Sequence, residues 1–176
     1  MAACGHLYFL EEEDMADAEF LPEEKPEFDY SGTVAIVEKL IDTCRDGEAG
    51  YRDAAEHITD SELRRYFQEQ SLERARFAGN LHTALERLGK WEQTHQGTLA
   101  GSVERTWFDV KRALGGGDST ILEAVEQGED RAKAAYQEAL RKQLPADITG
   151  LLRSQAQAIF AAHDHTRSLR DRRKTA

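Results

Sequence analysis

Apolar residues recur at steps of three and four along four long stretches of the chain, and this spacing constrains the fold more than any other feature. Such spacing places the apolar residues along one side of an α-helix. The expected helices cover about residues 31–58, 61–88, 120–143 and 145–174. The members of the four apolar stripes are Val37, Ile41, Cys44, Tyr51, Ala55 and Ile58, then Leu63, Phe67, Phe77, Leu81, Ala84 and Leu88, then Leu122, Val125, Ala132, Tyr136 and Ala139, and last Ile148, Leu152, Ile159, Thr166 and Leu169.

Polar residues at the ends of these stretches group the helices into two pairs. Ser31 is the expected N-cap of the first helix, and Thr59 and Thr120 each begin a capping box with a glutamate three residues later. Gly89 is typical of the position just beyond a helix end. Because only two or three residues separate the first helix from the second, these two helices must run antiparallel. The sequence therefore predicts two helical hairpins.

The connection between the two hairpins is long. Residues 89–101 form a polar, glycine-containing link, and residues 103–114 have the spacing of a short amphipathic helix. The dipeptide Gly47-Glu48 recurs 81 residues later as Gly128-Glu129, which indicates a duplicated hairpin. Two hairpins joined by a long crossover that contains a short helix predict an all-α, ferritin-like four-helix bundle.

Several short motifs carry a family resemblance over about residues 31–171. They are Asp46-Gly47-Glu48-Ala49-Gly50-Tyr51, Leu99-Ala100-Gly101, the glycine-rich Leu114 to Asp118 segment, Ile121-Leu122-Glu123, Gly128-Glu129-Asp130 and Ala162-His163-Asp164. In their order and spacing, the chain resembles a bacterial group of uncharacterised ferritin-like four-helix-bundle proteins. This resemblance implies the fold and a bacterial origin, and it implies no activity.

Most of the net charge lies in the first 30 residues. Residues 1–30 contain ten acidic residues and a single base, so this segment carries −9 of the net charge of −10. Such a segment cannot bury enough apolar surface to fold, and we expect a disordered tail before a domain at residues 31–176. No apolar run approaches the roughly 18 residues of a membrane span, and Met1 to Leu10 lack the basic flank of a secretory signal. We therefore expect no membrane segment and a cytoplasmic location.

Four polar residues interrupt the stripes near the middle of the expected bundle. Glu48 lies between Cys44 and Tyr51 in sequence, and Arg74, Glu129 and His163 hold similar places in the other three helices. Buried carboxylates are costly, and a guanidinium is a suitable counterion for them. One prediction is therefore a buried ionic cluster of these four residues, in which Arg74 pairs with Glu48, Glu129 or both.

The other prediction is a metal site at Glu48, Glu129 and His163, since oxygen and nitrogen ligands suit iron or manganese. The ferritin-like di-metal set has a glutamate from each of two helices and a Glu-x-x-His motif from each of the other two. Here Phe160 stands three residues before His163, where that motif has a carboxylate, and Phe77 and Asn80 replace the motif in the other hairpin. The predicted donor set is thus incomplete.

Three classes of function follow. The favoured class is a non-catalytic bundle with a structural, stress-related or partner-binding role, without cofactor or catalytic residue, whose partner is an unidentified protein or a second copy of the chain. The second is a degenerate ferritin-like protein that binds iron or manganese, or an oxidase. The third is an interaction module that uses the acidic residues 1–30. The net negative charge and the lack of a basic helical face disfavour nucleic acid as a partner.

Overall fold

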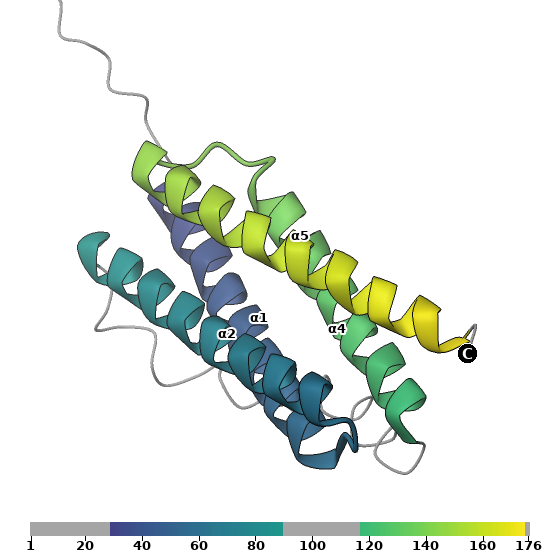
Figure 1. Ribbon diagram of the computed structural model, residues 1–176. Coiled ribbons are helices and arrows are strands. Elements are labelled where there is room, and N and C mark those ends of the chain that lie inside the picture. Colours follow the sequence, from purple (N-terminus) through teal and green to yellow (C-terminus); the bar gives the residue numbers. More distant parts are fainter. Residues whose placement is uncertain (1–28, 90–116, 175–176) are drawn as a thin grey trace, which may run out of the picture.

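The computed structural model describes residues 29–89 and 117–174, and these residues form four helices and no strand. The helices are α1 (Tyr30–His57), α2 (Ser61–Arg87), α4 (Gly117–Ala139) and α5 (Ala146–Lys174) (Figure 1). The predicted all-α four-helix class is confirmed. The predicted short helix at residues 103–114 and the acidic residues 1–28 lie outside the described residues.

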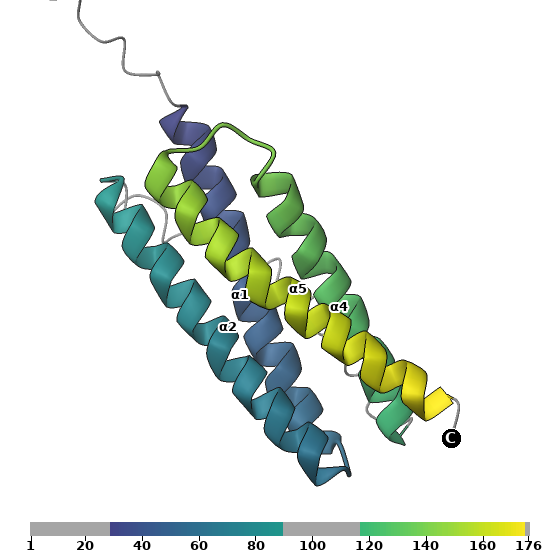
Figure 2. The same ribbon diagram turned by 45° about the horizontal axis from the view of Figure 1, so that its top comes forward.

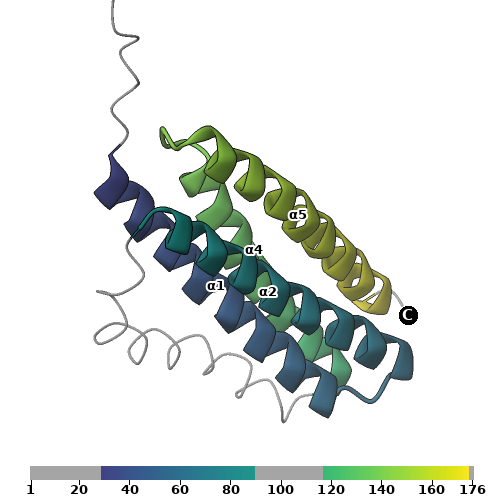
Figure 3. The ribbon, with the colours of Figure 1, turned by 90° about the vertical axis from the view of Figure 1, so that its left-hand side faces the viewer.

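The four helices form two antiparallel hairpins that pack side by side. Helix α1 packs along α2, α4 packs along α5, and α1 also packs against α4, whereas the contact between α2 and α5 is small. Figures 1 and 2 show that α2 and α4 run in the same direction, so the end of α2 and the start of α4 lie at opposite ends of the bundle. Figure 3 shows the same two hairpins from the left-hand side of Figure 1.

The predicted apolar stripes form the core. All of their members are buried except Leu88 and Leu169, which are half-buried. A fully buried aliphatic or aromatic side chain contributes about 1.5–3 kcal/mol relative to an exposed one, so the stripes are the main source of stability. The core is divided into two clusters. One contains Leu40 and Ile159, and the other contains Phe67 and Leu122.

Three of the predicted N-caps are wrong, and at two of these helix starts an aspartate is the cap instead. The N-cap of α1 is Asp29 rather than Ser31, and its carboxylate accepts from the Gly32 N–H at 2.8 Å. The N-cap of α2 is Asp60 rather than Thr59, because the backbone N–H and the hydroxyl of Thr59 both donate to Asp118 in α4. A residue at the start of a helix can thus hydrogen-bond to a neighbouring helix instead of capping its own.

The bounds of α4 also differ from the prediction. The helix begins at Gly117 rather than at Thr120, and it ends at Ala139 rather than near Gln143. At its C-terminal end the backbone tightens into turns with i to i+3 hydrogen bonds, such as Lys142 N–H to the Ala139 carbonyl at 3.0 Å. The predicted glycine beyond α2 is confirmed, since Gly89 has a φ of 72°.

Charged residues join three helices at one end of the bundle. The guanidinium of Arg173 in α5 contacts Asp60 and lies 3.1 Å from the Asp118 carboxylate. The backbone and side-chain donors of Thr59 hold the pKa of Asp118 below its usual value against the opposing effect of burial, so this carboxylate is charged near neutral pH. Arg173, near the end of α5, therefore packs onto the bundle. No described helix has an apolar stretch that could cross a membrane.

Candidate functional site

A buried ion pair connects α2 to α4 at the middle of the bundle. Arg74 is 1% exposed and Glu129 is 3% exposed. The Nη2 atom of Arg74 donates to both carboxylate oxygens of Glu129, at 2.9 and 3.0 Å. The pair lies between the two apolar clusters of the core, at positions that continue the apolar stripes of α2 and α4.

The side chain of Arg74 reaches Glu129 by passing over a glycine of α1. A Cβ atom at Gly47 would lie 3.2 Å from Cγ of Arg74 and 3.4 Å from its Cδ, which is tighter than ordinary contact. Glycine at this position therefore leaves room for the arginine stem between α1 and α2. The guanidinium carbon then lies 5.6 Å from the ring centre of Tyr51 and 5.7 Å from that of Phe77.

Electrostatics keep this arginine charged. Burial by itself would lower the pKa of Arg74, but the charge and hydrogen bonds of Glu129, together with the nearby Tyr51 and Cys44, outweigh burial and raise that pKa above its ordinary value. A second carboxylate, Glu73, has an oxygen 3.6 Å from Nη1. Such a buried pair adds little net stability compared with apolar packing, but removal of one partner leaves an uncompensated charge and costs about 3–5 kcal/mol.

Glu48 does not belong to the buried cluster, and its predicted place there is corrected. Its side chain is 34% exposed and lies 3.8 Å from Arg52 one turn further along α1. The residue that faces Arg74 is its neighbour Gly47. Tyr51 follows Cys44 by seven positions, so the spacing alone allowed either Gly47 or Glu48 to face the core.

His163 is buried as the stripe predicts, but it pairs with other residues. Its Nε2 lies 2.9 Å from a carboxylate oxygen of Asp130, and its Nδ1 lies 2.8 Å from one of Asp164. The Nζ atom of Lys133 lies 3.3 Å from the same Nδ1. His163 therefore joins α5 to α4 through Asp130 rather than through the adjacent Glu129.

The three predicted metal donors do not converge. Glu48 points outward, Glu129 accepts from Arg74, and His163 is held by aspartates. Within residues 29–89 and 117–174, no group of three or more His, Cys, Asp or Glu side chains is placed to hold a metal ion.

Sequence reasoning missed a second buried polar feature, a hydrogen-bonded chain that crosses all four helices. The Tyr136 hydroxyl donates to Gln155 at 2.7 Å and lies 3.1 Å from the Cys44 thiol. The Gln155 amide in turn donates to the Phe77 carbonyl at 3.2 Å. Gln155 follows Leu152 by three residues, which was the available signal that it faces the core. Burial raises the pKa of Cys44 to about 11, so this sulfur is a protonated thiol and a core residue, as predicted.

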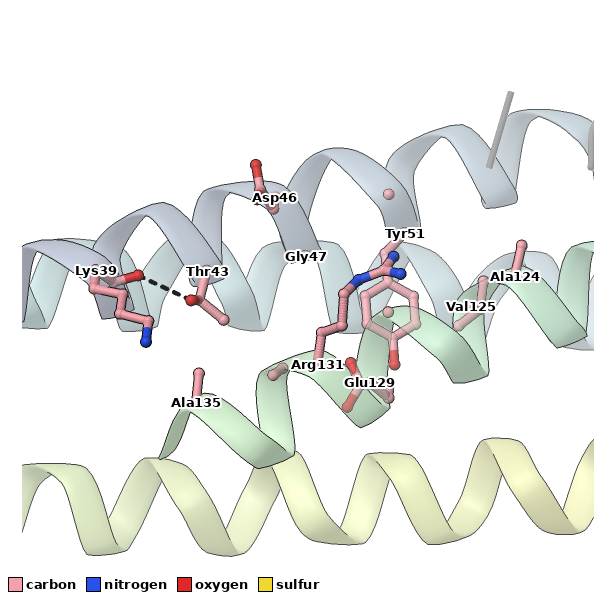
Figure 4. A pocket seen from close by; sticks show the side chains of 13 residues that line it. Lys39, Thr43, Asp46, Gly47, Tyr51, Ala124, Val125, Glu129, Arg131 and Ala135 are labelled. Atoms are coloured by element: carbon pink, nitrogen blue, oxygen red, sulfur yellow. Dashed lines mark hydrogen bonds between the residues drawn. The ribbon is translucent and has the colours of Figure 1, made fainter. Parts of the chain in front are cut away.

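A cavity of about 260 Å³ lies between α1 and α4 beside the ion pair (Figure 4). Tyr51 projects from α1 into the space between the two helices, and its hydroxyl points toward Glu129 (Figure 4). The cavity is lined by Lys39, Thr43, Asp46, Gly47, Gly50, Tyr51, Ala124, Val125, Gly128, Glu129, Arg131, Ala132 and Ala135.

Over residues 29–89 and 117–174, these features define an all-helical, four-helix arrangement with a buried arginine–glutamate pair at its centre. Residues 33–142 match the family described as "Domain of unknown function (DUF2383)", which covers more than half of the chain. The chain belongs to this uncharacterised family. No curated protein matches it.

Proposed function

We propose that this protein is a non-catalytic, ferritin-like four-helix bundle with a structural, stress-related or partner-binding role. The observation that carries the proposal is the buried contact between Arg74 and Glu129, both oxygens of which accept from one guanidinium nitrogen. In this proposal the arginine stands at mid-bundle, where di-metal proteins of the ferritin-like class place their metal ions.

The direction of the helices supports the ferritin-like assignment. Helices α2 and α4 run in the same direction, so α2 ends at the opposite end of the bundle from the start of α4 (Figure 1). A simple up-and-down bundle would instead alternate direction at every helix. One long connection between two hairpins is the ferritin-like topology.

The chemistry of the pair supports a role without a metal. A guanidinium remains protonated in proteins, so Arg74 is a permanent cation beside Glu129. A metal ion at Glu129 would have to displace this cation or lie next to it in a poorly solvated interior, and either arrangement is costly. The two other predicted donors, Glu48 and His163, are engaged elsewhere.

The proposal is tested by elemental analysis of the full-length protein, expressed in medium that contains added iron and manganese. We expect no stoichiometric iron or manganese, and the same result for the isosteric variant Glu129→Gln. A surface variant, His57→Gln, controls for metal held loosely by exposed imidazoles, since His57 is exposed. Circular dichroism checks that each variant is helical.

One result would overturn the proposal. It is stoichiometric iron or manganese in the natural protein that is retained in His57→Gln and lost in Glu129→Gln. That pattern would establish Glu129 as a metal ligand and would direct attention to the degenerate metal-binding function.

A further inference from the structure

We propose that the cavity between α1 and α4 binds a small neutral phenol, with the phenol hydroxyl between Tyr51 and Glu129 and its ring against the helix walls. Six of the thirteen residues that line the cavity are glycine or alanine, and their small side chains leave the space between the two helices open. These residues are Gly47, Gly50, Ala124, Gly128, Ala132 and Ala135.

Two glycines that line the cavity, Gly47 and Gly128, have different surroundings. At Gly47 the missing Cβ makes room for Arg74, whereas a Cβ at Gly128 would meet no atom within 4 Å. Gly128 is also not required by backbone conformation, since the described glycines with positive φ are Gly89 and Gly117. Glycine is unfavourable inside a helix, and at Gly128 it leaves open space at the wall of the cavity.

A buried hydroxyl at this cavity has no well-formed hydrogen bond. Tyr51 is 3% exposed, and its oxygen lies near the Glu129 carboxylate without a hydrogen bond of normal geometry to the described residues. Burial, followed by the nearby charge of Glu129, raises the pKa of Tyr51 well above its ordinary value, so the phenol is a neutral donor. An unsatisfied buried hydroxyl is costly, and a ligand oxygen that accepts from it would remove that cost.

Glu129 supplies the complementary acceptor. Each of its carboxylate oxygens accepts from Arg74, and a carboxylate has further lone pairs for a second donor. A hydroxyl can both accept from Tyr51 and donate to Glu129. A neutral ligand fits beside this ion pair, because Arg74 already balances the charge of Glu129.

The size of the cavity suits a single aromatic ring. An engineered apolar cavity of about 150 Å³ binds benzene, and the cavity here measures about 260 Å³. The ring of Tyr51 provides an aromatic contact at one side, where offset or edge-on packing is favourable. Phenol is therefore the simplest probe of this site.

The experiment measures binding of phenol and of toluene to the full-length protein by ligand-observed NMR or calorimetry. Toluene has a similar ring and lacks the hydroxyl. In Tyr51→Phe, phenol should bind about tenfold more weakly while toluene binding is unchanged. In Gly128→Leu, whose side chain enters the open space, both probes should lose binding.

Gly79→Leu is the matched control. Gly79 is also a helix-interior glycine with nothing within 4 Å of its Cβ position, but it lies exposed on α2 and outside the cavity. Phenol should bind this variant as it binds the natural protein. Thermal unfolding of the variants establishes that they are folded, and backbone NMR shifts on α1 and α4 locate the bound probe in each folded form.

Three results would overturn the proposal. The first is an absence of saturable phenol binding, which would leave the cavity to solvent. The second is undiminished phenol binding in Gly128→Leu, which would place the phenol elsewhere. The third is equal binding of phenol and toluene together with no effect of Tyr51→Phe, which would remove the role of the hydroxyl.

Discussion

The dipeptides Gly47-Glu48 and Gly128-Glu129 are identical in sequence and lie in the middle of α1 and α4, yet their surroundings are opposite. In α1 the glycine is packed against Arg74, and the glutamate is 34% exposed. In α4 the space beside the glycine is open, and the glutamate is 3% exposed and paired with Arg74.

The difference comes from a single side chain on a third helix. Arg74 extends from α2, passes over Gly47 of α1 and ends at Glu129 of α4. Gly47 and Glu129 therefore both contact Arg74, whereas Glu48 and Gly128 do not. Identical local sequences acquire different roles because the neighbouring helix presents a long cationic side chain to only one residue of each dipeptide.

The largest expected effect separates the two glutamates. Glu129→Gln should lower the free energy of unfolding by about 3–5 kcal/mol, because it removes the buried carboxylate that accepts from Arg74 and leaves only Glu73, at 3.6 Å, beside the guanidinium. Glu48→Gln should change it by less than about 0.5 kcal/mol, because an exposed pair contributes little. Urea denaturation of both variants measures the two values.

A double substitution distinguishes charge from shape at the same site. Arg74→Met combined with Glu129→Leu replaces both charges by apolar groups, and it should recover most of the stability that Glu129→Gln loses. If Glu129→Gln costs no more than Glu48→Gln, the contrast between the two glutamates is wrong.

The next largest effect concerns Gly47 and Gly128, whose replacement by alanine should change the free energy of unfolding in opposite directions. Gly128→Ala should stabilise the protein by about 0.5–1 kcal/mol, since alanine is the better helix former and the space is open. Gly47→Ala should destabilise it by about 1–3 kcal/mol, because the new methyl overpacks the buried arginine stem. Thermal or urea unfolding gives both values, and Gly79→Ala on α2 should match the gain of Gly128→Ala. A gain at Gly47 equal to that at Gly128 would contradict the close packing of Arg74.

The smallest effect concerns salt. Double-mutant cycles should give a coupling energy for Glu48 with Arg52 of less than about 0.5 kcal/mol, and about 1 M NaCl should remove it. The coupling of Arg74 with Glu129 should be larger and nearly independent of salt, because water and ions do not reach it. Equal salt dependence of the two couplings would mean that the core pair is solvated.

The periodic apolar positions were sufficient to predict the helices and most of the core. Phe67, Leu122 and Ile159 are buried because each continues a stripe that the chain itself defines. The prediction succeeded because burial of such a stripe is favourable against any apolar neighbour. The expected antiparallel direction of α1 and α2 followed likewise from the short turn at residues 58–60.

The candidate site could be predicted only in part. The sequence singled out Arg74 and Glu129 as polar residues within stripes, but it left the partner of Arg74 open between two glutamates. It also placed His163 beside Glu129, whereas its ring contacts Asp130. An error of one residue along a helix turns a side chain by about 100°, which is enough to move a carboxylate from the core to the surface.

By itself, therefore, the sequence determined that the chain forms long amphipathic helices, which residues they bury and which unusual polar residues the core must accommodate. The tertiary structure alone decided three contacts. Thr59 donates to Asp118 instead of capping α2, Gly47 packs against the stem of Arg74, and Glu129 rather than Glu48 pairs with the Arg74 guanidinium. The physical reason is the range of the interactions. Helix periodicity acts between residues three or four apart, whereas a buried charge is satisfied by whichever group the packing of separate helices brings within hydrogen-bond distance.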